Sequence, residues 1–258
     1  MRDKTLRDEG LILLTTGKRY TKHLANMIDG GIVHIYSPGC ADYSYGIDGT
    51  PDLETVYAGT GKTNEIILKS ASTLINFFLK RGIRVEYGLV LADVEAEDGF
   101  RQEKMKISEA EFVSRVSESK LSATTDMDSR FNEIGILGHP LLTSGVYLMR
   151  RDGFYTAVDE TVGEGKVANL TPSQIRGNAL TRRYLYQKWL KGKHLGPSDF
   201  DEAMDAIAKR YMIEFFTFGE NMRRRKAIIL SIDDPIMGHL YGVPCFILPK
   251  PKKGGNKI

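Results

Sequence analysis

The strongest constraint on the fold lies between residues 32 and 93, where a strand-like run, a helical run and a second strand-like run follow one another. Ile32–Tyr36 is a short β-branched and aromatic segment, and Arg84–Asp93 is a longer, mainly apolar one, both typical of buried strands. Between them, residues 64–80 carry apolar side chains at helical spacing, and Arg81-Gly82 ends the pattern. A strand, a helix and a strand in this order predict two neighbouring parallel strands.

The rest of the chain extends this pattern. We expect further strands at 144–149, 227–232 and 243–248, and helices over 108–121, 171–191 and 198–218. The helix at 171 has the clearest start, because Thr171, Pro172 and Gln174 form a capping box with proline at the first helical position. The sequence therefore predicts an α/β fold: a single Rossmann-like domain over residues 1–249, with a mostly parallel sheet flanked by helices. Residues 250–258 are rich in Lys and Gly and are expected to form a disordered basic tail.

Composition excludes several classes of protein. Apolar residues make up 41% of the chain, which is enough for a core, and two cysteines are too few for a disulfide scaffold. No apolar run approaches the roughly 20 residues that span a bilayer, and the charged N-terminus lacks a signal-peptide pattern. The five histidines have no metal-ligand spacing. We therefore expect a cytoplasmic protein that binds neither a membrane nor a metal.

Charge is distributed unevenly along the chain. Residues 1–129 carry 16 Lys/Arg against 20 Asp/Glu, whereas residues 130–258 carry 20 against 13. The basic half suits a polyanionic partner, and its basic residues alternate with aromatic ones over 176–191, as in surfaces that bind nucleic acids. The alternative is a helix that packs its aromatic side chains inward and exposes its charges to water. The candidate contacts with nucleic acid are Arg182, Arg183, Lys188, Arg223, Arg224 and Arg225.

The first strand ends in a candidate site. Pro38 lacks an N–H and Gly39 permits a turn, so Ser37 and Cys40 are expected where the strand stops and a loop begins. In open α/β sheets this edge is where ligands bind. The alternative is an ordinary turn with a buried cysteine.

A second candidate lies on the expected helix over 198–218. Tyr211 and Glu214 are three residues apart, so they share a helix face. Glu214 stands among apolar residues, so it lies either at a wet helix edge or in a partly buried place with a partner, such as a substrate ammonium.

Two other motifs are weaker. Gly59–Thr63 ends like a phosphate-binding loop, but Val56 stands where that motif needs glycine, which favours a mobile polar loop. Asp93, Glu95, Glu97 and Asp98 could hold a divalent cation, although an acidic surface loop explains them better.

Taken together and in order, these pieces resemble the tRNA-dependent cyclodipeptide synthases, whose domain is related to class I aminoacyl-tRNA synthetases. The resemblance covers about half of the chain in patches: Ser37-Pro38-Gly39-Cys40 with Tyr43-Ser44-Tyr45, then 85–98, 211–218, 228–236 and 243–248. The departures are a Tyr–Glu spacing of three rather than four, Cys40 in place of a small residue or Asn, Leu230-Ser231 in place of Tyr-His, and the absence of an Arg-rich helix after the second strand.

The resemblance implies an aminoacyltransferase that builds a cyclic dipeptide from aminoacyl-tRNAs without a cofactor. Ser37 would be the nucleophile, favoured by position over Cys40, and Glu214 and Tyr211 would hold the substrate amino group. Substrate contacts would come from Gly39, Cys40, Tyr87 and Asp233, and the protein is expected to be a monomer. Isocyanide synthases, which act on a free amino acid, share a comparable layout, and a non-catalytic RNA-binding module remains a further alternative.

Overall fold

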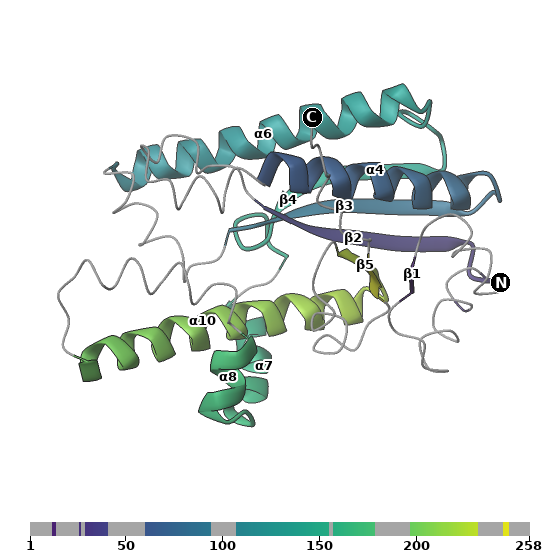
Figure 1. Cartoon of the computed structure of the whole chain (residues 1–258). Helices are drawn as coiled ribbons and strands as arrows, with labels where there is room; N and C mark the ends of the chain where they lie inside the picture. Colours follow the sequence, from purple (N-terminus) through teal and green to yellow (C-terminus); the bar gives the residue numbers. More distant parts are fainter. Residues whose placement is uncertain are drawn as a thin grey trace, which may run out of the picture.

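The computed structural model describes residues 12–13, 26, 29–40, 60–93, 107–154, 157–178, 197–231 and 245–247. They form a six-stranded sheet in the order β1-β6-β5-β2-β3-β4 with helices on both faces (Figure 1). The strands are β1 (Ile12–Leu13), β2 (Ile32–Cys40), β3 (Arg84–Ala92), β4 (Leu142–Leu148), β5 (Ile228–Ser231) and β6 (Cys245–Ile247). Neighbouring strands from β6 to β4 are parallel, and only β1 is antiparallel to its neighbour. The predicted α/β class with a mostly parallel, helix-flanked sheet is confirmed.

The expected strand–helix–strand unit is present at the centre of the sheet. β2 pairs in parallel with β3 along its whole length, from Ile32 opposite Arg84 to Cys40 opposite Ala92. The connecting helix, α4 (Thr60–Leu79), begins four residues before the expected start at residue 64, so Gly61 and Lys62 belong to its first turn. Gly82 follows α4 with a φ of 70°, which glycine adopts without strain.

The prediction that β2 ends before Ser37 is wrong. Ser37, Pro38 and Gly39 continue the strand and pair with Leu89, Val90 and Leu91 of β3. Proline is tolerated here because the pairing of β2 with β5 covers only Ile35 and Tyr36, so the described part of β2 beyond Tyr36 behaves as an edge on that side.

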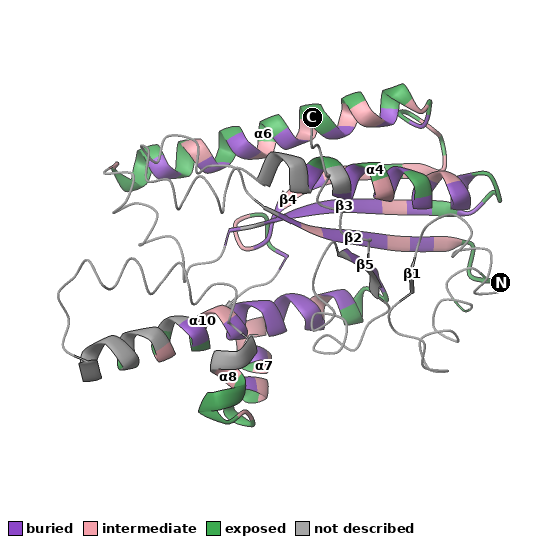
Figure 2. Cartoon of the chain, in the orientation of Figure 1, coloured by how far each residue is buried: buried purple, intermediate pink, exposed green. Residues whose placement is uncertain are grey.

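One face of the sheet is covered by α4 and α6 (Glu109–Glu133), and both helices contribute to a single apolar core with the strands (Figures 1 and 2). Ser108 caps α6 by accepting a hydrogen bond from the Glu111 N–H at 3.2 Å. α6 continues twelve residues beyond the expected end near residue 121. Its buried side chains recur at intervals of three or four residues within an otherwise polar sequence, as Phe112, Val116, Ser119, Ala123, Met127 and Phe131.

The other face is covered by α10 (Pro197–Arg224), against which α7 (Ala157–Ala168) and α8 (Pro172–Asn178) pack (Figure 1). The predicted capping box at α8 is confirmed, because the Thr171 N–H donates to the Gln174 side chain at 2.8 Å and the Gln174 N–H donates back to Thr171 Oγ1 at 3.3 Å. α10 is longer than expected at its C-terminal end, and it includes Arg223 and Arg224 rather than leaving them in a turn. The expected continuation of α8 to residue 191 and the basic tail lie outside the described residues.

Among the residues described, none of the helices combines the length and apolar content that crossing a bilayer requires.

Candidate functional site

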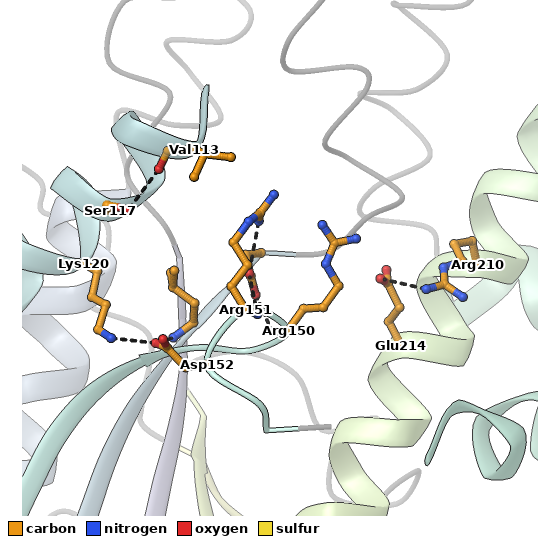
Figure 3. Close-up of polar contacts among 10 residues, drawn as sticks. Val113, Ser117, Lys120, Arg150, Arg151, Asp152, Arg210 and Glu214 are labelled. Atoms are coloured by element: carbon orange, nitrogen blue, oxygen red, sulfur yellow. Dashed lines mark hydrogen bonds and ion pairs between the residues drawn. The ribbon is translucent and has the colours of Figure 1, made fainter. Parts of the chain in front are cut away.

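The carboxyl ends of β2, β3 and β4 lie at one edge of the sheet, which is where α/β proteins place their sites. Three features of the described residues lie near this edge: Ser37 on β2, Asp93 directly after β3, and Arg150 and Arg151 in the turn after β4. Glu214 on α10 faces the same region (Figure 3). Each feature places a polar group against the apolar core.

Ser37 is fully buried and its hydroxyl has no hydrogen-bonding partner among the described residues. Side chains alternate along a strand, so Ser37 shares the α4 and α6 face with Ile35, which belongs to the core on that side. Nearly all buried polar groups in folded proteins are hydrogen-bonded, so a buried hydroxyl without a partner is an unusual feature that marks Ser37 as a candidate site residue.

Tyr87 lies beside Ser37 on the same face of the sheet. Tyr87 pairs with Ile35, two residues before Ser37 along β2, and its hydroxyl also has no partner of good geometry among the described residues. Burial raises the pKa of the Tyr87 phenol, and the nearby Ser37 side chain lowers that pKa by less. Tyr87 is therefore a neutral proton donor beside the Ser37 hydroxyl, and the structure brings these two predicted site residues together.

Gly39 is the next residue of β2 on this face, and the side chain of Asn64 from the first turns of α4 lies directly over it. A Cβ at Gly39 would be 2.9 Å from both Asn64 Oδ1 and Leu89 Cδ1. Only glycine permits this close approach between α4 and β2 without a shift. Gly39 thus allows α4 to pack closely against β2 next to Ser37. The side chain of Cys40 is not among those that the structure describes.

Asp93 fixes the turn that follows β4. Its carboxylate accepts hydrogen bonds from the backbone N–H of Arg150 at 2.6 Å and from that of Arg151 at 3.1 Å, and the Arg151 guanidinium donates a third at 3.1 Å. Asp93 is fully buried, which corrects the expectation of a solvated acidic loop at this residue. Glu95, Glu97 and Asp98 lie outside the described residues.

The same turn is held a second time from α6. Asp152 accepts a hydrogen bond from the Leu148 N–H at 2.6 Å and forms an ion pair with Lys120 of α6 at 2.8 Å (Figure 3). With both ends of the turn fixed, the Arg150 side chain extends across the edge of the sheet toward α10 and Glu214 (Figure 3).

Glu214 is a fully buried carboxylate on α10. Arg210, one turn earlier, lies 3.5 Å from Glu214 Oε1 and is itself held by both oxygens of Glu160 of α7, at 2.7 and 2.8 Å. Of the two alternatives for Glu214, the structure therefore has the buried carboxylate with a charged partner. Tyr211 is partly buried, and its ring stacks on Phe215 with 4.4 Å between centroids.

Ser37 and Glu214 lie on opposite faces of the sheet. Ser37 faces α4 and α6 with Ile35, whereas Tyr36, on the other face of β2, packs in the core that includes Phe215 and Phe218 of α10. The structure thus brings Ser37 together with Tyr87 and Gly39, and Glu214 together with Arg210 and Tyr211, as two separate groups.

Three of the basic residues expected to contact nucleic acid make internal contacts. Arg223 pairs with Glu220, Arg224 pairs with Asp159 at 2.9 Å, and Arg225 stacks on the ring of Phe154 at 5.1 Å from its centroid. The other candidates lie outside the described residues: Arg182, Arg183, Lys188 and, for substrate binding, Asp233.

Sequence reasoning missed the positive groups of the site. Arg150 and Arg151 resembled an exposed turn, because a strand followed by Arg-Arg-Asp-Gly has no feature that distinguishes a bound turn from a solvated one. Arg210 and Glu160 are fifty residues apart in sequence, so their ion pair could not be predicted without knowing that α7 packs on α10. In the described part of the chain, no group of three or more His, Cys, Asp or Glu side chains could hold a metal ion.

Comparison with known proteins gives structural similarity but no sequence match. No family model matches the chain, and no curated protein matches it in sequence. Among solved structures, the PvcA protein from Pseudomonas aeruginosa is similar with a TM-score of 0.46 and 13% sequence identity, over 96% of this chain and 78% of that one. A likeness at this identity and score does not extend to function, so the resemblance to cyclodipeptide synthases stays a prediction.

Proposed function

We propose that this chain is an aminoacyltransferase that accepts an amino acid from an aminoacyl-tRNA on the hydroxyl of Ser37. The observation that carries the proposal is the Ser37 Oγ, a fully buried oxygen with no hydrogen-bonding partner among the described residues. A buried polar group of this kind costs stability, and such costs are typical of catalytic and ligand-binding positions.

The step needs no energy source beyond the substrate. Ser37 Oγ attacks the ester carbon of the aminoacyl-tRNA, a new ester bond to Oγ forms, and the bond to the ribose oxygen breaks. The hydroxyl proton passes to that ribose oxygen, which leaves as the free tRNA end. In this proposal the Tyr87 hydroxyl, kept neutral by its raised pKa, orients Ser37 or donates a hydrogen bond to the developing oxyanion.

Glu214 supplies a carboxylate for the substrate ammonium, with Tyr211 on the same helix. Because Ser37 and Glu214 project from opposite faces of the sheet, an aminoacyl group that contacts both must lie across the carboxyl end of β2. The amine of a second aminoacyl-tRNA then attacks the ester carbon on Ser37, which forms the peptide bond and frees the Ser37 hydroxyl. The free amine of the resulting dipeptidyl-tRNA attacks its own ester carbon, which closes the cyclic dipeptide and releases the second tRNA through its ribose oxygen.

The test is mass spectrometry of the protein after incubation with charged tRNA. We expect an aminoacyl adduct on Ser37 that is absent from Ser37→Ala. The matched control is Ser72→Ala, because Ser72 is also a buried serine but donates its hydroxyl to the Lys69 carbonyl at 2.7 Å. An adduct of full yield in Ser37→Ala would overturn the proposal.

A second candidate is an enzyme that acts on a free amino acid. Arg150 extends toward Glu214, and Arg210 flanks it from the same helix (Figure 3). A carboxylate between two guanidinium groups suits the ammonium and carboxylate of a zwitterion, whereas an aminoacyl ester has no free carboxylate. Binding of free amino acids in the absence of tRNA, lost in Arg150→Gln, would favour this candidate over the first.

A further inference from the structure

A small cleft lies between α4 and α6, away from the carboxyl edge of the sheet. It has a volume of about 160 Å³ and is lined by Ser72, Thr73, Asn76, Phe77, Lys80, Arg81, Arg130 and Ile134. Leu79 ends α4 just before β3 begins at Arg84, so the cleft is at the amino end of β3 and is separate from the site around Ser37. Its volume corresponds to a few water molecules, at about 30 Å³ each.

The lining of the cleft is positively charged. Lys80, Arg81 and Arg130 bring three cations together, and Glu133, which lines the neighbouring cleft, accepts a hydrogen bond from Arg130 Nη1 at 2.7 Å. Part of this charge offsets the negative C-terminal ends of α4 and α6. Three cations against one carboxylate still leave an excess of positive charge at the cleft.

Several donors at the cleft are not used by the described residues. Arg130 Nε is buried and has no hydrogen-bonding partner among them. Within the same residues, the Lys80 ammonium and the Asn76 side-chain amide have no hydrogen bond or ion pair either. By contrast, Ser72 Oγ and Arg81 Nη1 already donate to main-chain carbonyls of α4, so we do not count these two residues among the donors for a ligand.

We propose that this cleft binds a phosphate-type oxyanion through Lys80, Asn76 and Arg130. Glu133 accepts a hydrogen bond from one nitrogen of Arg130 and restrains its guanidinium, while Asn76 reaches the cleft from the last turn of α4 and Lys80 directly follows that helix. A tetrahedral oxyanion offers an acceptor to each of these donors at once, which a single water does not. The chemistry is that of a free phosphate or of a phosphate group on a small molecule.

The experiment is a titration of the full chain with inorganic phosphate at constant ionic strength, read by isothermal calorimetry and by the shift in Tm. We expect saturable binding that raises Tm, and a dissociation constant at least about tenfold weaker in Lys80→Gln, as for the loss of one charge-assisted hydrogen bond. Lys69→Gln is the matched control, because Lys69 is an exposed lysine of α4 that lines the neighbouring cleft instead. It should bind phosphate as the unchanged protein does.

A second variant, Asn76→Ala, removes a neutral donor and keeps the net charge, so it separates a built site from general attraction. Equal phosphate binding by the unchanged protein, Lys80→Gln and Asn76→Ala would overturn the proposal, as would an effect that chloride reproduces. A short single-stranded RNA forms the second arm. Binding of RNA that depends on Lys80, with no saturable binding of free phosphate, would overturn the small-molecule assignment in favour of a nucleic-acid backbone.

Discussion

Asp93 Oδ1 accepts a hydrogen bond from the backbone N–H of Arg150 at 2.6 Å, which ties the end of β3 to the turn that follows β4. The second oxygen of Asp93 accepts from the Arg151 N–H and from its guanidinium, each at 3.1 Å. Burial raises the pKa of Asp93 by more than these three donors lower it. Asp93, although costly to bury, thus orders the turn that carries Arg150 and Arg151.

Replacing Asp93 with Asn should destabilise the protein. An amide keeps one acceptor oxygen but places an NH₂ group against two N–H donors, and a buried hydrogen bond to a charged group contributes about 1.5–3 kcal/mol. We expect a loss of about 2 kcal/mol in the free energy of unfolding, measured by urea denaturation. Arg151→Gln removes only the guanidinium contact and should cost less. Equal stability of Asp93→Asn and the unchanged protein would show that the turn does not depend on this carboxylate.

The contact between α7 and α10 should depend on the absence of a side chain at Gly163. A Cβ there would overlap the Ile213 carbonyl oxygen and Thr217 Oγ1. We expect Gly163→Ala to lower stability by about 1–3 kcal/mol, as overpacking does. Gly165→Ala, on the same helix with open space around it, should raise stability by about 0.5–1 kcal/mol because alanine favours the helix. Calorimetric Tm values of the two variants that moved in the same direction would contradict this packing.

The pH dependence of stability should include a contribution from Glu220. Hydrogen bonds from Arg223 lower the pKa of Glu220 below its ordinary value of 4.5, with smaller help from Lys166. A carboxyl whose folded pKa is depressed stabilises the fold above its unfolded pKa and loses that contribution as the pH falls through the folded value. The unchanged protein should therefore lose more stability than Glu220→Gln on acidification, as followed by unfolding curves at successive pH values. Arg223→Gln should lose part of the same dependence.

Ser37→Ala should leave the protein at least as stable as before. The Ser37 hydroxyl is buried and makes no hydrogen bond of good geometry with the described residues, the neighbouring Tyr87 included, so its removal relieves part of a desolvation cost of about 1–3 kcal/mol. Ser72→Ala should instead destabilise, because the Ser72 hydroxyl is paired. A clear loss of stability in Ser37→Ala would mean that its hydroxyl is bonded in the folded protein and would remove the observation on which the proposed acyl acceptor rests.

A second polar group on the sheet, on its α10 face, gives a double-mutant test. Glu86 accepts hydrogen bonds from the buried Tyr36 hydroxyl and, in one ring tautomer, from His34 Nδ1 at 3.0 Å. Glu86→Leu should cost about 1–3 kcal/mol because it leaves the Tyr36 hydroxyl with only a long contact to Arg225 at 3.4 Å. The double variant Tyr36→Phe with Glu86→Leu should recover part of that loss, as measured by urea unfolding. Additive losses would indicate that the two side chains do not interact.

The central βαβ unit was predictable because its signals are local. Each signal spans only a short stretch of sequence: the apolar β-branched run of a strand, the helical spacing of apolar residues, and the glycine at which the helix ends. The capping box at Thr171 is equally local. The strand end at Ser37-Pro38-Gly39 was not predictable, since proline usually ends pairing. Here β2 continues because β3 alone supplies the ladder beyond Tyr36, which is a property of the neighbouring strands.

Local sequence patterns were enough to predict the strands β2 to β6, the helices α4 and α10 and the start of α6, and to place the carboxyl ends of the parallel strands at one edge. They did not predict α7 or the second half of α6. The sequence also singled out Ser37, Tyr87 and Glu214 by residue type and place. Which of these residues meet depends on the packing of distant elements. Side-chain alternation turns Ser37 toward Tyr87 on one face of β2, and the packing of α10 brings Glu214 to Arg210 and Glu160 on the other. That division depends on the pairing of elements far apart in the chain, which no local pattern of residues encodes.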